Sequence, residues 1–98
     1  MKIIWTEKAE KQLDQIFHYI ATDSPLYAHR TVERIIEQAE SISRHPGKVR
    51  TVPEYEREDI REVFYHPYRV IYLIKDHDHV IEILSVIHGP RLLTNKPE

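Results

Sequence analysis

The chain has 98 residues, of which 41% are hydrophobic and 31% are charged, and it carries a formal net charge of -2. These values predict one soluble globular domain over residues 1–98 with a modest core, and no apolar run approaches the roughly 20 residues that a membrane helix needs. The slightly negative net charge argues against a protein whose main function is to bind nucleic acid. The absence of cysteine excludes disulfides and thiolate metal sites and is compatible with a reducing cytosol.

Two helical patterns follow a short strand predicted at residues 2–5. Thr6 is a good N-cap for the first helix, which is expected to end near Thr22. Pro25 fits the first turn of the second helix, which ends near residues 45–47. Each helix has one apolar stripe at helical spacing: Ala9, Leu13, Ile16, Phe17 and Ile20 in the first, and Ala28, Val32, Ile35, Ile36, Ala39 and Ile42 in the second. The tight connection between them predicts an antiparallel helical hairpin.

Three strand patterns follow a polar, acidic connection at residues 48–59. A turn at Pro67-Tyr68 separates the first two strands, and a turn at residues 76–78 separates the last two. The order strand, helix, helix, strand, strand, strand predicts an α+β fold of the β-α-α-β-β-β type. In this fold the helical hairpin packs on one face of a small, mainly antiparallel sheet.

The alternation of side chains along the strands predicts a second sheet face that two helices cannot cover. This face is expected to carry Arg69, Ile71, Leu73, Glu82, Leu84 and Val86. Since a large exposed apolar patch usually marks an interaction site, we expect the C-terminal tail, a second copy or a partner to lie on it. The side of the sheet on which Arg61 lies stays open, because a two-residue turn would place it opposite to Arg69 and a three-residue turn on the same face.

Short motifs accompany this order of elements, each weak alone and more specific together. They are Trp5-Thr6 before Ala9, Leu13, Ile16 and Tyr19-Ile20; Pro25, Ala28 and Pro46-Gly47; Ile60-Arg61-Glu62-Val63; Tyr68-Arg69-Val70-Ile71-Tyr72; and His88 with Arg91. Over essentially the whole chain they resemble the RelE/ParE superfamily of bacterial toxins, the toxic halves of type II toxin–antitoxin modules. Within the superfamily the chain looks most like the ParE branch.

The resemblance implies a cytoplasmic toxin that inhibits DNA gyrase by binding and is neutralised by a cognate antitoxin. It implies no cofactor and no metal, and it assigns any contact with promoter DNA to the antitoxin complex. Members similar to RelE instead cleave messenger RNA in the ribosome without a metal ion, and this activity is the alternative.

The expected target-binding residues are Arg61, Arg69, His88 and Arg91, together with the tail from Leu92 onward. Under the nuclease alternative the same four residues would be catalytic, with arginines stabilising the phosphorane and His88 acting as general acid or base. The expected antitoxin-binding residues are Leu13, Phe17, Ile71, Leu73, Leu84 and Val86.

Three departures from the nuclease pattern favour the gyrase interpretation, and one of them is the slightly acidic overall charge, which does not suit docking on ribosomal RNA. The connection before Arg61 is acidic, whereas a phosphate-binding loop should be basic, and no aromatic residue follows His88. Each candidate also has a plainer interpretation. Arg61 and Arg69 could pair with Glu62, with Glu82 or with the acidic connection, and His88 could be an ordinary strand-end residue. The Asp76-His77-Asp78-His79 cluster is expected to be a solvated hairpin tip and not a metal site.

Overall fold

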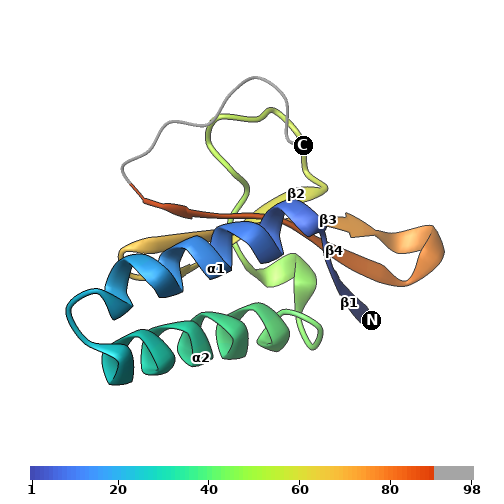
Figure 1. Ribbon diagram of the computed structural model, residues 1–98. Coiled ribbons are helices and arrows are strands. Elements are labelled where there is room, and N and C mark those ends of the chain that lie inside the picture. Colours follow the sequence, from blue (N-terminus) through green and yellow to red (C-terminus); the bar gives the residue numbers. More distant parts are fainter. Residues whose placement is uncertain (90–98) are drawn as a thin grey trace.

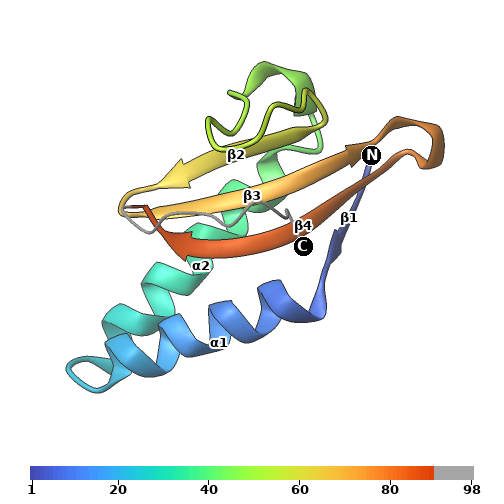
Figure 2. The same cartoon turned by 90° about the horizontal axis from the view of Figure 1, so that it is seen from above.

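The computed structural model describes residues 1–89, with the side chain of Lys48 excepted. The elements are β1 (Lys2–Trp5), α1 (Glu7–Ala21), α2 (Pro25–Ser41), β2 (Ile60–Tyr65), β3 (Tyr68–Lys75) and β4 (Val80–His88), with 3-10 turns at Pro46–Lys48 and Asp76–Asp78. The strands form one sheet in the order β1-β4-β3-β2, in which β1 is parallel to β4 and the other pairs are antiparallel (Figure 2). Both helices lie on one side of this sheet (Figure 1), which confirms the predicted α+β fold.

Both helices begin at the residues that the sequence predicts. The Oγ1 atom of Thr6 accepts a hydrogen bond from the Ala9 N–H at 3.1 Å, and the Oγ atom of Ser24 accepts one from the Tyr27 N–H at 3.1 Å. Each such cap stabilises a helix by about 1 kcal/mol. The Thr6 hydroxyl also donates to the Ile83 carbonyl at 2.7 Å, so the residue that starts α1 ties it to β4.

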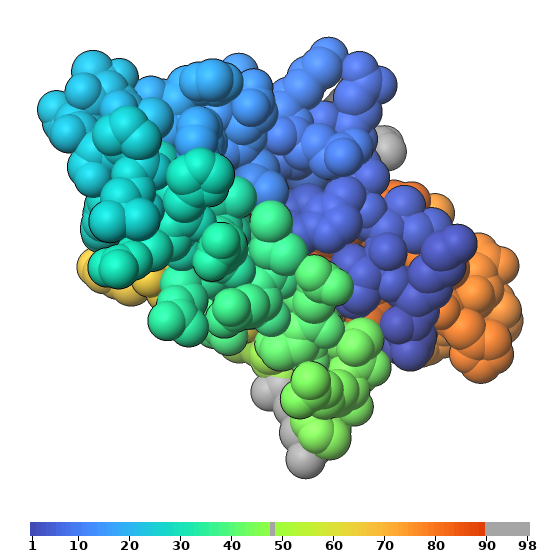
Figure 3. All heavy atoms as spheres, turned by 60° about the horizontal axis from the view of Figure 1, so that its bottom comes forward, coloured from blue at the N-terminus to red at the C-terminus, as the bar shows by residue number. Residues whose placement is uncertain are grey.

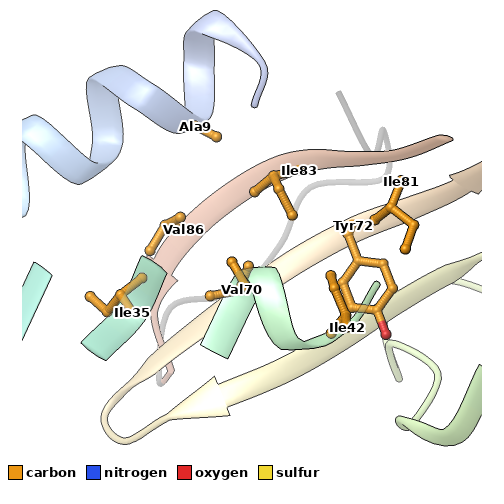
Figure 4. Packing of buried hydrophobic residues seen from close by; sticks show 9 residues of the cluster. Ala9, Ile35, Ile42, Val70, Tyr72, Ile81, Ile83 and Val86 are labelled. Carbon is orange, nitrogen blue, oxygen red and sulfur yellow. The ribbon is translucent and has the colours of Figure 1, made fainter. Parts of the chain in front are cut away.

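The main core lies between the helices and the sheet (Figure 4). Its buried members are Ala9, Ile35, Ala39, Ile42, Val70, Tyr72, Ile81, Ile83 and Val86. The ring of Tyr72 reaches from β3 to the end of the helical layer, where its hydroxyl donates to the Pro46 carbonyl at 3.2 Å. Among the described residues, no helix has the length and apolar character of a membrane span.

A bulge in β4 reverses the expected facing of the strand's last residues. Ile71 pairs with Ser85 and Tyr72 pairs with Ile83, so Leu84 is one extra residue between them. An extra residue shifts the alternation by one step and moves the following side chains to the opposite face. The placement of Val86 on the second face is therefore wrong, because this side chain is 2% exposed and belongs to the main core.

The second face of the sheet is covered by the chain itself. The later part of the connection between α2 and β2, which carries Val52 and Tyr55, lies on the side opposite the helices (Figure 1). It contributes Val52 and Tyr55 to a second buried cluster with Ile60, Ile71 and Leu84, against which Leu73 packs half-buried. The expectation that Ile71 and Leu84 lie on an uncovered face is therefore wrong. A connection with a mostly polar sequence can still cover a sheet when two of its apolar side chains point inward.

Candidate functional site

Arg61 is held by backbone carbonyls. Its Nε atom donates to the Glu58 carbonyl at 2.7 Å, and its Nη1 atom donates to the carbonyls of Val49 at 2.8 Å and Gly47 at 3.3 Å. The residue pairs with Tyr72 across a two-residue turn, which places it on the face opposite to Arg69. Its guanidinium therefore fastens both ends of the connection to β2.

Arg69 lies on the other face and is 5% exposed. Its Nη1 and Nη2 atoms donate to the two carboxylate oxygens of Glu54, each at 2.8 Å, and its Nε atom donates to Glu62 at 2.7 Å. Hydrogen bonds to Glu54 and then to Glu62 raise the pKa of Arg69 above its ordinary value, so the side chain remains cationic. The plainer interpretation, in which Arg69 pairs with Glu62 and the acidic connection, is confirmed.

Glu62 joins Arg69 to a second arginine. Its side chain is fully buried and also bonds to Arg50, whose guanidinium stacks over the Phe64 ring with 4.9 Å to the centroid. Since a buried charge is tolerated only when it is paired, the four side chains Arg50, Glu54, Glu62 and Arg69 form one unit without net charge. The unit joins the connection to β2 and β3.

A cleft of about 660 Å³ opens beside this unit, near the turn between β2 and β3. Arg50, Glu54, His66, Arg69 and His88 are among its lining residues. The two expected site residues Arg69 and His88 therefore lie in one cleft, whereas Arg61 points to the helix side. Arg91 and the tail from Leu92 lie outside the described residues.

His88 is exposed at the end of β4 and contacts Tyr68 edge-on, with the ring centroids 6.0 Å apart. The next residue, Gly89, donates its N–H to the Pro67 carbonyl at 2.6 Å. A Cβ atom at Gly89 would lie 2.9 Å from that oxygen, so the close approach requires glycine. This contact sets where β4 ends beside the cleft.

A second candidate surface is a groove of about 460 Å³ between α1 and α2. Leu13, Phe17, Val32 and Ile36 form its apolar wall, and its other lining residues are Trp5, Glu10, Asp14 and His29. The Phe17 ring stacks edge-on against His29 with 5.0 Å between centroids. Figure 3 views the molecule from the helix side, where α1 and α2 form much of the surface. The expected antitoxin residues Leu13 and Phe17 are half-buried in this groove.

The tip of the helical hairpin carries large apolar side chains in solvent. Tyr19, Leu26 and Tyr27 are 80%, 63% and 60% exposed. Burial raises the pKa of the nearby Tyr68, and Tyr27 and then Tyr19 add to the shift, so this end of the molecule gathers several phenols. The hairpin tip was not among the expected sites, although tyrosines outside a helix's apolar stripe are a signal that the sequence offers.

Residues 3–93 match the family model described as the ParE toxin of the type II toxin–antitoxin system parDE. The chain belongs to this toxin family. The match spans both helices and every strand, so the resemblance to the ParE branch of the RelE/ParE superfamily is confirmed.

Individual relatives agree with this assignment. The toxin is 32% identical over 93 residues to the putative toxin Y4kP of Sinorhizobium fredii, covering 90% of this chain and 88% of that protein. It is 31% identical over 91 residues to the toxin RelE2 of Caulobacter vibrioides, covering 93% and 98% of the two chains. It is also similar to the solved chromosomal ParDE TA system from P. aeruginosa, with a TM-score of 0.73 and 26% identity over 90% of this chain and 95% of that chain.

In this ParE-family toxin the expected residues separate into two layers. The groove with Leu13 and Phe17 belongs to the helices, and Arg69 belongs to the opposite side of the sheet. His88, at the end of β4, lines both the cleft with Arg69 and a pocket with Ile16 and Tyr19 of α1. Arg50 was missed because it lies in the connection, where no periodic pattern marks a side chain as inward or outward. Within residues 1–89 no group of side chains could hold a metal ion, and the Asp76–His79 tip is exposed.

Proposed function

We propose that this toxin inhibits DNA gyrase by binding, in the manner of the ParE branch, and has no chemistry of its own. One observation carries the proposal: the two arginines on which a nuclease would depend are engaged within the fold. Arg69 is paired with two carboxylates and Arg61 with three carbonyls. Metal-free RNA cleavage needs cations that are free to stabilise the phosphorane, and these two are not free in this conformation.

His88 supports the second candidate, a RelE-like mRNA endonuclease that acts on the ribosome. His88 is exposed and is one of the residues that line the cleft with Arg50 and Arg69, where a general acid or base could meet a phosphate. We rank this activity second because the charges of the arginines in the cleft are balanced by Glu54 and Glu62.

We place the gyrase contact at the end of the molecule that carries His88 and the hairpin tip. Tyr19 and Tyr27 are exposed there, and tyrosine is one of the residues that contribute most to protein–protein affinity. Both candidate targets act in the cytoplasm, which is the location that we propose for the toxin.

We further propose that a cognate antitoxin occupies the groove between α1 and α2. The relative from P. aeruginosa is described as a ParDE TA system, which supports a partner of this kind. Apolar side chains of the partner would contact Leu13, Phe17 and Val32, and the carboxylates of Glu10 and Asp14 suit a basic residue beside them.

The deciding experiment is a supercoiling assay with purified gyrase and the purified toxin. We expect loss of supercoiling or accumulation of cleaved complexes. The Tyr27→Ala toxin should inhibit gyrase more weakly than the matched control Thr22→Ala. A parallel translation reaction is expected to show intact messenger RNA. Codon-specific cuts that disappear with His88→Ala, together with unaffected gyrase, would replace the proposal by the nuclease.

A further inference from the structure

Glu54 binds Arg69 in the geometry with which arginine binds a phosphate. Both outer nitrogens of the guanidinium donate to both carboxylate oxygens of Glu54, each at 2.8 Å. The planar fork of arginine accepts carboxylate and phosphate oxygens in this same two-point arrangement. The position of the Glu54 carboxylate is therefore one that a solution oxyanion could take.

We propose that Glu54 is the internal occupant of an oxyanion-binding site formed by Arg69 and Arg50, and that it keeps this site closed. The ligand class is a phosphate-like oxyanion. The Glu54 side chain is 24% exposed whereas that of Arg69 is 6% exposed, so the carboxylate stands between the buried guanidinium and the solvent of the cleft.

The charges of the unit explain how the site is closed. Two arginines face two glutamates, and the buried Glu62 remains bonded to both arginines. Removing the charge of Glu54 alone leaves one positive charge in excess and a buried guanidinium with half of its fork unpaired. An unpaired buried charge is strongly unfavourable, so an oxyanion from solution would be drawn into the vacated position. The cleft of about 660 Å³ has room for it.

The connection keeps Glu54 in place through its apolar neighbours. Val52 is fully buried and Tyr55 is 9% exposed, so the residues on both sides of Pro53-Glu54 are anchored in the second cluster. Lifting this segment from the sheet would withdraw the carboxylate and uncover Arg69. The contact is thus autoinhibitory toward anions and operates independently of any gyrase contact.

The test is the affinity of the purified toxin for inorganic phosphate, measured by isothermal titration calorimetry in chloride buffers of constant ionic strength. We expect Glu54→Gln to bind phosphate at least about tenfold more tightly than the unsubstituted protein, a difference of about 1.4 kcal/mol. Glu56→Gln removes the same charge from an exposed neighbour and is expected to bind no better than the unsubstituted protein. Equal affinities in all three proteins, or an equal gain in both variants, would overturn the proposal.

A melting experiment covers the case in which Glu54→Gln is unstable. A ligand that binds only the folded state raises the melting temperature. Phosphate should therefore raise the melting temperature of Glu54→Gln more than chloride at the same ionic strength, and it should restore folding if the variant is unfolded in chloride. If phosphate has no selective effect on this variant, the proposal that Glu54 is the internal occupant of the site is wrong.

Discussion

In this toxin, the identity of some single residues is determined by the atoms that they contact in the folded structure. The Glu62 side chain is fully buried, which is tolerable because Arg50 and Arg69 contact its two carboxylate oxygens. Gly89 suits its position because a Cβ atom there would lie only 2.9 Å from the Pro67 carbonyl oxygen. Neither constraint is visible in the local sequence, since each partner lies elsewhere in the chain.

Tyr72 makes stability depend on pH in the alkaline range. Burial raises its pKa to about 12, whereas a tyrosine in the unfolded chain titrates near 10. Below pH 10 the phenol is neutral in both states and its contribution is fully present. Between pH 10 and 12 only the unfolded chain loses the proton, so we expect the free energy of unfolding to fall as pH rises, by at most about 1.4 kcal/mol per pH unit for this residue.

Urea unfolding at pH 9, 10 and 11 measures this effect. Tyr72→Phe should lower the stability at pH 9 by about 1 kcal/mol through loss of the bond to Pro46, and it should flatten the decline at higher pH. A decline as steep as that of the unsubstituted toxin would place the titrating group elsewhere, since Tyr55 and Tyr68 also have raised pKa values.

At the scale of elements, the helical hairpin packs through one face and leaves a groove on another. One face packs on the sheet, and the groove between α1 and α2 stays accessible along Leu13 and Phe17. Thr6 and Gln12 fasten α1 to the sheet, since the Thr6 hydroxyl donates to the Ile83 carbonyl and Gln12 accepts a hydrogen bond from the Val86 N–H at 2.8 Å. These two hydrogen bonds fix α1, which forms one side of the groove, against β4.

Phe17→Ala should weaken antitoxin binding by about 2 kcal/mol, roughly 30-fold in affinity, because an aromatic side chain leaves the groove. Tyr19→Ala removes an aromatic side chain two residues away, outside the groove, and should leave the affinity within about threefold. Calorimetric titration with the cognate antitoxin measures both, after circular dichroism has shown that each variant is folded. The reverse ranking would move the antitoxin from the groove to the hairpin tip.

The whole molecule is a stack of three layers: two helices, the sheet, and the part of the connection from Val52 onward (Figures 1 and 2). The third layer depends on few side chains. Val52 and Tyr55 fill the second cluster, and the charged unit around Arg69 fastens its edge. Its stability is therefore expected to respond to single substitutions.

Val52→Ala should lower the free energy of unfolding by about 2 kcal/mol, because the substitution leaves a cavity beside Ile71 and Leu84. Backbone amides of the connection should then exchange with deuterium faster than those of the main core. Val32→Ala is the control, since Val32 is half-buried beside the groove and should cost less. Equal costs for both variants would mean that the connection is not a structural layer.

The amino-acid sequence by itself determined the elements, their order and the side of the sheet on which the helices lie. These follow from local signals: the cap at Thr6, Pro25 in the first turn of the second helix, the helical spacing of the stripes, and alternation in β2 and β3. The motifs from Trp5-Thr6 to His88 were also sufficient to indicate the toxin family. Such features are set by residues close together in the chain, so a pattern can show them.

Only the tertiary structure decided what covers the second face and which charges are neutralised. The bulge at Leu84 moved Val86 into the core, and Val52 and Tyr55 placed the connection over Ile71 and Leu84. Arg69 met Glu54 from a segment 15 positions away. These outcomes depend on contacts between segments that are distant in the sequence, and a local pattern does not show such contacts. In addition, a single extra residue in a strand is enough to move the following side chains to the other face of the sheet.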